Sequence, residues 1–387
     1  MQTPSVFQTG YESHNLMEWS QQQEAALSAV SQWLKRGDSQ VFRLFGYAGT
    51  GKTTLARELA EGVDGDVLFA AFTGKAAQVL REKGADSART IHSLIYRPRG
   101  ESAEDDDGQR SPTFSLNRQS AVAKAALVVI DECSMVDEAL GKDLLSFNTP
   151  ILVLGDPGQL PPVAGGGFFT EAEPDFMLTE VHRQARDNPI IDLAMRVREG
   201  SPIEFGRYGE SSVIGRADID QEMVLAADQV LVGTNRTRRL YNGRLRQLKG
   251  FTDVLPEAGD KLVCLRNNTE KGLLNGSLWS VSSVSRKPGQ TMQMLVKAED
   301  AGPRPPVAKI KVLKQAFQEG PESIPWQLRR GTDMFDYGYA LTVHKSQGSQ
   351  WDDVVLFDES FAFKEHRDRW LYTAITRAAK RLTLVKS

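Results

Sequence analysis

Short runs of apolar residues, rich in Val, Ile and Leu, recur through the first half of the chain. These runs are residues 41–45, 67–71, 127–130 and 151–154. Between some of them, residues 53–61 and 75–83 carry apolar positions at helical spacing. Strands that are apolar on both faces and alternate with helices are typical of a parallel sheet covered on both sides. The first half therefore predicts an α/β layer.

The second half repeats this pattern, with apolar runs at 230–232, 354–357 and 382–385. Two segments differ from it. Residues 97–115 are polar and acidic and contain Pro and Gly near both ends, which predicts a loop or hairpin. From about Leu274 to Arg329, three strand-like runs (280–284, 292–296 and 308–313) are separated by turn signals. This spacing predicts a small all-β module inserted in a second α/β domain.

Composition limits the classes of protein that this chain can belong to but does not identify a function. A chain of 387 residues, 40% hydrophobic and 25% charged, has room for two or three domains. Residues 1–20 lack the apolar core of a signal peptide, and no apolar run approaches the length that crosses a bilayer. Cys133 and Cys264 lie far apart, so we expect no metal site from them and a reducing, cytoplasmic setting. The net charge of −3 disfavours a protein that coats nucleic acid, although a basic channel remains compatible with it.

A phosphate-binding loop follows the first apolar run. Residues 46–53 read GYAGTGKT, which fits the pattern GxxxxGK[ST] between a strand and a helix. Glycines let backbone N–H groups converge on phosphate oxygens, and the helix N-terminus favours negative charge. Lys52 is expected to reach the β- and γ-phosphates, and the Thr53 hydroxyl to bind Mg²⁺. The full set of loop residues predicted to bind ATP is Gly46, Gly49, Gly51, Lys52, Thr53 and Thr54.

A pair of carboxylates ends another predicted strand, at Asp131 and Glu132. Asp131 is expected to hold Mg²⁺ together with Thr53. Glu132 is expected to orient and deprotonate the attacking water, and this second carboxylate favours hydrolysis over simple binding.

Further motifs follow in order from about Gln23 to Arg377. They lie at residues 20–27, 71–77, 90–93, 155–162, 178–184, 342–349 and 371–378. In this order they resemble the motifs of superfamily 1B DNA helicases, the RecD-like and Dda-like group. The resemblance covers nearly the whole chain and implies an ATP-driven motor that moves 5′-to-3′ on single-stranded DNA.

The resemblance implies several residues around the nucleotide. Gln23 would read adenine, with Gln21 and Gln22 as alternatives in register. Gln159 would sense the γ-phosphate. Two arginines, Arg183 and Arg377, would face the phosphates, because a guanidinium fork matches phosphate oxygens and stays charged. Gln347 and Gly348 would lie near the nucleotide as well.

The resemblance also implies residues on the DNA. These are Thr73, Lys75, Thr90, His92, Asn235, Arg236, Thr342 and His344, with Phe114 as a wedge. His92 alone fits a structural histidine nearly as well. Residues 235–250 carry six basic side chains and no acid, so this segment predicts a phosphate-tracking helix or an ordinary solvated helix face. Aromatics suited to base stacking, or equally to the core, are Phe72, Tyr96, Phe114 and Trp351.

The implied architecture is α/β, with two RecA-like domains and two small insertions. The first domain would span residues 1–92 and 118–185, and the second 186–272 and 330–387. Residues 93–117 would form a pin that splits the duplex, and residues 273–329 an SH3-like β module. The acidic middle of the pin would repel phosphate, so its tip is expected to point away from DNA.

The function that follows is an ATP- and Mg²⁺-dependent helicase acting on single-stranded DNA and single-strand/duplex junctions. We expect a monomer without membrane contact, in a bacterial or phage-infected cell. Replication or single-strand-binding proteins are possible partners, and replication, repair or recombination are possible settings. Two alternatives share every motif: a single-strand translocase that remodels complexes, and a motor subunit of a larger recombination or repair complex. RNA stays open as a substrate.

Overall fold

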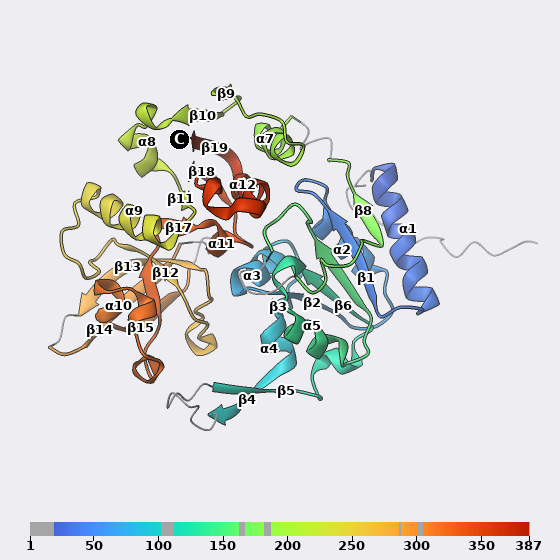
Figure 1. Cartoon of the computed structure of the whole chain (residues 1–387). Helices are drawn as coiled ribbons and strands as arrows, with labels where there is room; N and C mark the ends of the chain where they lie inside the picture. The colour runs from blue at the N-terminus through green and yellow to red at the C-terminus, as the bar shows by residue number, and fades with distance from the viewer. Residues whose placement is uncertain are drawn as a thin grey trace, which may run out of the picture.

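The computed structural model describes residues 19–101, 112–161, 167–181, 187–285, 288–299 and 305–386. Its first unit is a six-stranded parallel sheet with strand order β3-β2-β6-β7-β1-β8 (Figure 1). The strands are β1 (Val41–Gly46), β2 (Val67–Ala71), β3 (Arg89–Thr90), β6 (Leu127–Asp131), β7 (Ile151–Gly155) and β8 (Phe176–Leu178). The helices of this unit are α1 (Gln21–Arg36), α2 (Lys52–Glu61), α3 (Gly74–Glu82), α4 (Ile91–Ile95) and α5 (Glu138–Leu145).

A second six-stranded sheet has the order β17-β11-β18-β19-β10-β9 and is parallel except for the β9–β10 pair. Its strands are β9 (Gly206–Tyr208), β10 (Ser211–Gly215), β11 (Gln229–Val232), β17 (Ala340–Thr342), β18 (Trp351–Phe357) and β19 (Ala378–Lys386). Its helices are α7 (Pro189–Arg198), α8 (Gln221–Ala226), α9 (Asn235–Leu248), α11 (Val343–Ser346) and α12 (Arg367–Ile375).

Both parallel sheets form for the reason that the sequence suggests. The central strands β6 and β7 are buried almost throughout, and apolar clusters cover both faces of the first sheet. Every strand predicted from an apolar run is confirmed, and each observed strand contains the predicted residues. The predicted two-sheet α/β architecture is therefore confirmed.

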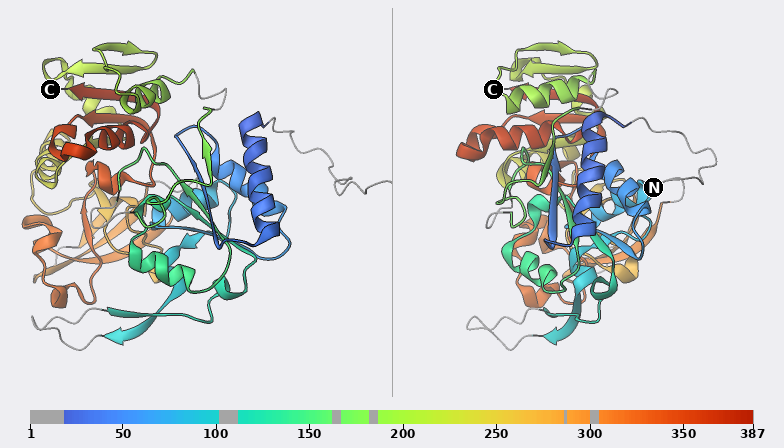
Figure 2. Two further views of the ribbon diagram at one scale, coloured as in Figure 1. Left: turned by 45° about the vertical axis from the view of Figure 1, so that its right-hand side comes forward. Right: turned by 90° about the vertical axis from the view of Figure 1, so that its right-hand side faces the viewer.

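A five-stranded antiparallel sheet, β15-β14-β13-β12-β16, packs beside the second parallel sheet. Its strands are β12 (Lys261–Cys264), β13 (Leu278–Ser285), β14 (Thr291–Ala298), β15 (Val307–Leu313) and β16 (Phe335–Tyr337), with the short helix α10 (Gln315–Gln318). The sheet extends beyond the predicted module of residues 273–329, because β12 pairs with β13 and β16 adds to β12 as an edge strand. A two-stranded hairpin, β4 (Tyr96–Glu101) and β5 (Pro112–Leu116), leaves the first unit. In Figures 1 and 2 it lies at the opposite end of the molecule from β9 and β10.

The antiparallel sheet and the second parallel sheet share one apolar cluster, in which Trp279 and Phe335 are among the largest buried side chains. The two parallel-sheet units meet at the carboxyl ends of β1, β6 and β7. The phosphate-binding loop of residues 46–53, the P-loop, lies there. Among the described residues, no helix combines the length and apolar character needed to cross a membrane.

Candidate functional site

The loop after β1 adopts a backbone that only glycine accommodates easily. Gly49 and Gly51 have φ angles of 78° and 79°, and α2 begins directly after them at Lys52. The Lys52 ammonium donates to the carbonyl oxygens of Gly46 (2.6 Å) and Tyr47 (2.9 Å), so it lies over the loop. The free N–H groups at the start of α2 and this ammonium are arranged to hold an anion.

The predicted carboxylate pair lies beside this loop. The Thr53 hydroxyl donates to Asp131 Oδ2 at 2.9 Å, and the Glu132 N–H donates to Asp131 Oδ1 at 2.8 Å. Glu132 has a φ of 53°, a strained value for a residue other than glycine, and such strain often occurs at functional sites. Burial raises the pKa of Glu132, against the opposing effects of Arg377 and Lys52. This carboxyl therefore has the environment of a base poised to accept a proton.

Gln159 lies in the turn after β7. Asp156 shapes this turn by accepting from the Gly158 N–H at 2.9 Å, and burial raises the pKa of Asp156. Gln159 is buried, and its side-chain oxygen has no hydrogen-bond partner in the described part of the chain. Since buried polar atoms are nearly always paired, this amide is available to a bound molecule or water.

Arg377 directly precedes β19 and reaches the site from the other parallel-sheet unit. Its guanidinium donates to Thr373 O (3.0 Å), Ser349 O (3.1 Å) and Thr376 Oγ1 (3.2 Å), which fixes its direction. The second predicted arginine, Arg183, lies outside the described residues.

One cavity of about 400 Å³ joins these groups. Its lining includes Gly49, Lys52, Thr53, Asp131, Glu132, Asp156 and Gln159 from the first unit, and Gly348, Ser349 and Arg377 from the second. The structure thus brings together most of the predicted catalytic residues between the two parallel sheets. A larger cavity, of about 550 Å³, lies between α8, α9 and β12 and contains none of them.

Two predicted nucleotide residues point into the protein instead. Gln23 caps α1 by accepting from the Ser20 N–H (3.0 Å), and its amide donates to Thr50 O (3.2 Å). Gln347 donates to Leu160 O at 3.1 Å. Gln23 therefore supports the P-loop in this conformation, and Gln347 ties the segment before β18 to the turn that carries Gln159. Adenine recognition by Gln23 stays a prediction.

Sequence reasoning missed a link across the cleft. Tyr372, on α12, accepts from the Ala48 N–H of the P-loop (2.9 Å) and donates to Asp156 Oδ2 (2.8 Å). Nearby, the Arg198 guanidinium lies 3.8 Å above the ring of Tyr47. Both contacts join residues that are far apart in sequence, and no local sequence pattern predicts them. The only available signal was that Tyr372 lies in the same motif as Arg377.

The threonines predicted to face DNA all cap short helices. Thr73, Thr90 and Thr342 accept from the N–H groups of Ala76 (3.1 Å), Ser93 (3.2 Å) and Lys345 (3.4 Å). Lys75 is buried, whereas Asn235 and Arg236 are exposed at the start of α9. The side chain of Phe114 lies outside what the structure describes.

The two predicted DNA histidines each lie among aromatic rings. The His92 ring centroid is 5.9 Å from that of Phe72 and 5.7 Å from that of Tyr96. His344 lies 5.5 Å from Phe363. Burial lowers the pKa of both histidines, so each favours the neutral form. Trp351 is buried in the core of the second sheet, so stacking on a base is the wrong interpretation for it.

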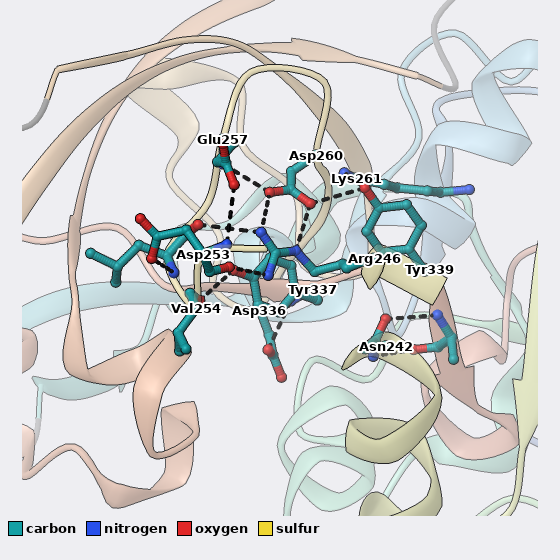
Figure 3. Close-up of polar contacts among 12 residues, drawn as sticks. Asn242, Arg246, Asp253, Val254, Glu257, Asp260, Lys261, Asp336, Tyr337 and Tyr339 are labelled. Atoms are coloured by element: carbon teal, nitrogen blue, oxygen red, sulfur yellow. Dashed lines mark hydrogen bonds and ion pairs between the residues drawn. The ribbon is translucent and has the colours of Figure 1, made fainter. Parts of the chain in front are cut away.

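Two of the six basic residues in 235–250, a segment predicted to form either a phosphate-tracking helix or a solvated helix face, are buried. Arg246 forms a two-point ion pair with Asp260, at 2.8 Å for both contacts, and donates to Asp253 O at 2.6 Å (Figure 3). Arg238 is buried against Asp336. The sequence contains no acid within this helix, but the acids come from β16 and from the loop before β12. These two arginines therefore fasten α9 to the antiparallel sheet, and the exposed basic part consists of Arg236, Arg239, Arg244 and Lys249.

The comparisons with known proteins agree with this geometry. The family profile described as "AAA domain" matches residues 18–218, and that of the "UvrD-like helicase C-terminal domain" matches residues 337–385. The chain is 30% identical over 373 residues to the ATP-dependent RecD2 DNA helicase of Deinococcus radiodurans, covering 87% of this chain and 46% of that protein. It is 24% identical over 383 residues to the ATP-dependent DNA helicase Pif1 of Bdellovibrio bacteriovorus, covering 87% and 81%.

Among solved structures, Pif1 helicase from Bacteroides in complex with ADP-AlF₃ and ssDNA superposes with a TM-score of 0.56 at 18% identity, covering 92% of this chain and 91% of that one. At that identity the likeness shows the fold. The AAA domain match extends over more than half of the chain. The chain therefore belongs to the AAA domain family, and over most of its length it is similar to the RecD2 and Pif1 helicases named above. It spans less than half the length of the RecD2 relative.

Proposed function

We propose that this chain hydrolyses ATP to move 5′-to-3′ along single-stranded DNA and to unwind duplex at single-strand/duplex junctions. The observation that carries the proposal is the cavity between the two parallel sheets. Lys52 and Glu132 enter it from one sheet unit and Arg377 from the other. A nucleotide bound there touches both units, so its hydrolysis changes how strongly they are held together. This is the coupling that a motor needs.

The residues of the cavity divide the chemistry of hydrolysis among them. Lys52 and the N-terminus of α2 hold the phosphates, and Glu132 takes the proton of the attacking water. Arg377, with Arg183 from the other predicted motif, stabilises the charge of the transferring phosphoryl group. Gln159 has an unpaired amide oxygen that suits contact with the attacking water.

The residues present also fit Mg²⁺. A hydroxyl and a carboxylate, those of Thr53 and Asp131, lie 2.9 Å apart beside the phosphate loop. Oxygen donors of this kind are the ligands that Mg²⁺ prefers. When bound, the ion supplies positive charge that neutralises the phosphate oxygens.

The DNA strand is proposed to cross both units on the side of Thr73, Thr90, His92, Thr342 and His344. In this arrangement the β4–β5 hairpin acts as the pin, and the five-stranded antiparallel sheet is the SH3-like module of related enzymes. Support comes from the placement of Gly74, whose absent side chain leaves room for Leu274 of the antiparallel-sheet unit. The segment that carries Thr73 and Lys75 thus packs directly against the module.

A second candidate is the motor portion of a larger protein or complex, which remodels DNA with little unwinding of its own. The chain spans only 46% of the RecD2 relative, and this observation favours keeping the alternative. Both candidates hydrolyse ATP, and they differ in how well they separate the strands of a duplex.

The test of the shared part is ATP hydrolysis with and without an oligo(dT) strand. We expect DNA to stimulate hydrolysis by the wild type and Lys52→Ala to abolish it. A matched control is Lys35→Ala, a substitution in the last turn of α1, away from the cavity. Hydrolysis that is insensitive to DNA would argue against a motor, and hydrolysis that survives Lys52→Ala would argue against this site.

A further inference from the structure

Three neighbouring parallel strands of the second sheet end at the same edge. The order β17-β11-β18 places Thr342 and His344, Gly233 and Thr234, and the segment after Phe357 next to one another. In open α/β sheets, ligands bind outside the carboxyl ends of the strands. The residues proposed to hold DNA follow two of these strands. The third strand leads into residues 358–366, which no motif assigned to DNA.

Specific contacts fix this third segment. Glu359 accepts from the Gly233 N–H at 2.6 Å and from the Thr237 hydroxyl at 2.6 Å, which ties the segment to the start of α9. The Phe363 ring lies 5.5 Å from that of His344. The same ring stacks on that of the buried Trp370, with 5.3 Å between the ring centroids. The segment is therefore fastened to the predicted DNA residues on either side of it.

Within this segment, Phe361 is 64% exposed. Three residues later Lys364 has a φ of 44° and a ψ of −113°, a strained conformation for a side chain other than glycine. An exposed apolar side chain by itself is ordinary. Here, however, the exposed ring lies in a segment that also holds a strained turn and the exposed Lys364, and that contacts His344 through Phe363, at an edge where a ligand is expected.

We propose that Phe361 is a base-stacking residue that holds an unpaired nucleobase of the DNA strand, with Lys364 beside it for the phosphate. The inference rests on the proposed function, since it adds a contact to the same strand. Aromatic faces stack on any base, so a stacking residue of this kind suits a motor that must accept every sequence. The contact lies outside the ATP cavity and leaves the basal chemistry untouched.

The chain offers a matched control. Phe205 is 60% exposed and precedes β9, at the far edge of the same sheet. Its ring lies 5.4 Å from the Lys386 ammonium, so it also combines an exposed ring with a neighbouring cation. It differs from Phe361 in position, because in the strand order β9 lies at the opposite end of the sheet from β17, which leads into Thr342 and His344.

The experiment measures the affinity of the full chain for fluorescent oligo(dT) and for a strand of the same length with abasic sites, together with basal and DNA-stimulated ATPase. We expect Phe361→Ala to weaken oligo(dT) binding about 5- to 150-fold, the range that base stacking contributes. Phe361→Trp should restore binding, and Phe205→Ala should bind like the wild type. On the abasic strand, wild type and Phe361→Ala should bind equally. Basal ATPase should stay unchanged in all three variants.

Equal oligo(dT) affinity of wild type and Phe361→Ala would overturn the inference while leaving the proposed function intact. An equal loss on the abasic strand would overturn it as well, because a loss without bases is not stacking. A wild type that neither binds oligo(dT) nor responds to it would refute the proposed function itself.

Discussion

Replacing Tyr372 by phenylalanine removes a single oxygen atom that joins the two parallel-sheet units. The ring of Tyr372 is buried, and its hydroxyl accepts from the Ala48 N–H at 2.9 Å and donates to Asp156 at 2.8 Å. Phenylalanine keeps the packing and loses both bonds. The variant therefore isolates the link between α12, the P-loop and the turn that carries Gln159.

The size of the effect follows from the partners. The bond to the P-loop joins two neutral groups, and such a bond contributes about 0.5–1.5 kcal/mol net; every 1.4 kcal/mol changes an equilibrium constant about tenfold. Local opening of the P-loop in the nucleotide-free protein should therefore become roughly 2- to 12-fold more frequent. Loss of the hydroxyl also removes a bond that lowers the pKa of Asp156, so its pKa should rise further.

Hydrogen exchange followed by mass spectrometry measures this opening directly. Tyr372→Phe should lose protection in the peptide that contains residues 46–51, with no change in the antiparallel sheet. ATP hydrolysis should fall too, because Asp156 holds the turn of Gln159. The control is Tyr208→Phe, which removes an exposed hydroxyl that donates to Glu204 O, just before β9. If both variants show wild-type exchange at the P-loop, the proposed link across the cleft has no energetic role.

The remaining predictions concern three other residues. Glu132→Gln should bind ATP normally but lose hydrolysis in a single-turnover assay, and equal loss of binding would contradict its role as a base. Since burial raises the pKa of Glu132, wild-type hydrolysis should decline as pH falls through a value above the ordinary glutamate range; a decline confined to lower pH would contradict that burial. Arg246→Met should destabilise the fold by about 3–5 kcal/mol in urea unfolding, because it leaves the buried Asp260 carboxylate without its cationic partner. Oligo(dT) affinity of the folded Arg246→Met protein should stay at the wild-type value. A large loss of affinity would indicate that this arginine contacts DNA after all. Asp156→Asn should lower DNA-stimulated hydrolysis more than nucleotide affinity, measured with a fluorescent ATP analogue, and the reverse order would indicate a simple binding role.

Local pattern was enough to predict the strands and the phosphate loop. A run such as 127–130 is apolar on both faces, and a buried parallel strand is the element that uses it. The spacing of Gly46, Gly51 and Lys52 likewise reflects a backbone requirement that is local. For these features each observed strand contains all the residues that were predicted for it.

Contacts between distant segments were beyond local reasoning. The arginines of α9 look alike in sequence, yet Arg246 is buried and Arg236 exposed, because only Arg246 faces the acid at residue 260. The Tyr372 hydroxyl meets a P-loop amide 324 residues away. Phe361 becomes a candidate DNA contact only once the strand order places its segment beside His344. In each case the missing information was which segments the two folded sheets bring together.

Strand separation tests the central claim most directly. The substrates are two duplexes of the same sequence, one with a 5′ and one with a 3′ single-stranded tail, mixed with the protein, ATP and Mg²⁺. We predict that the labelled strand is released from the 5′-tailed duplex alone, and that Lys52→Ala releases none. Release confined to the 3′-tailed duplex would contradict the assigned direction. Absence of release from both, with DNA-stimulated ATPase intact, would contradict unwinding and favour the translocase.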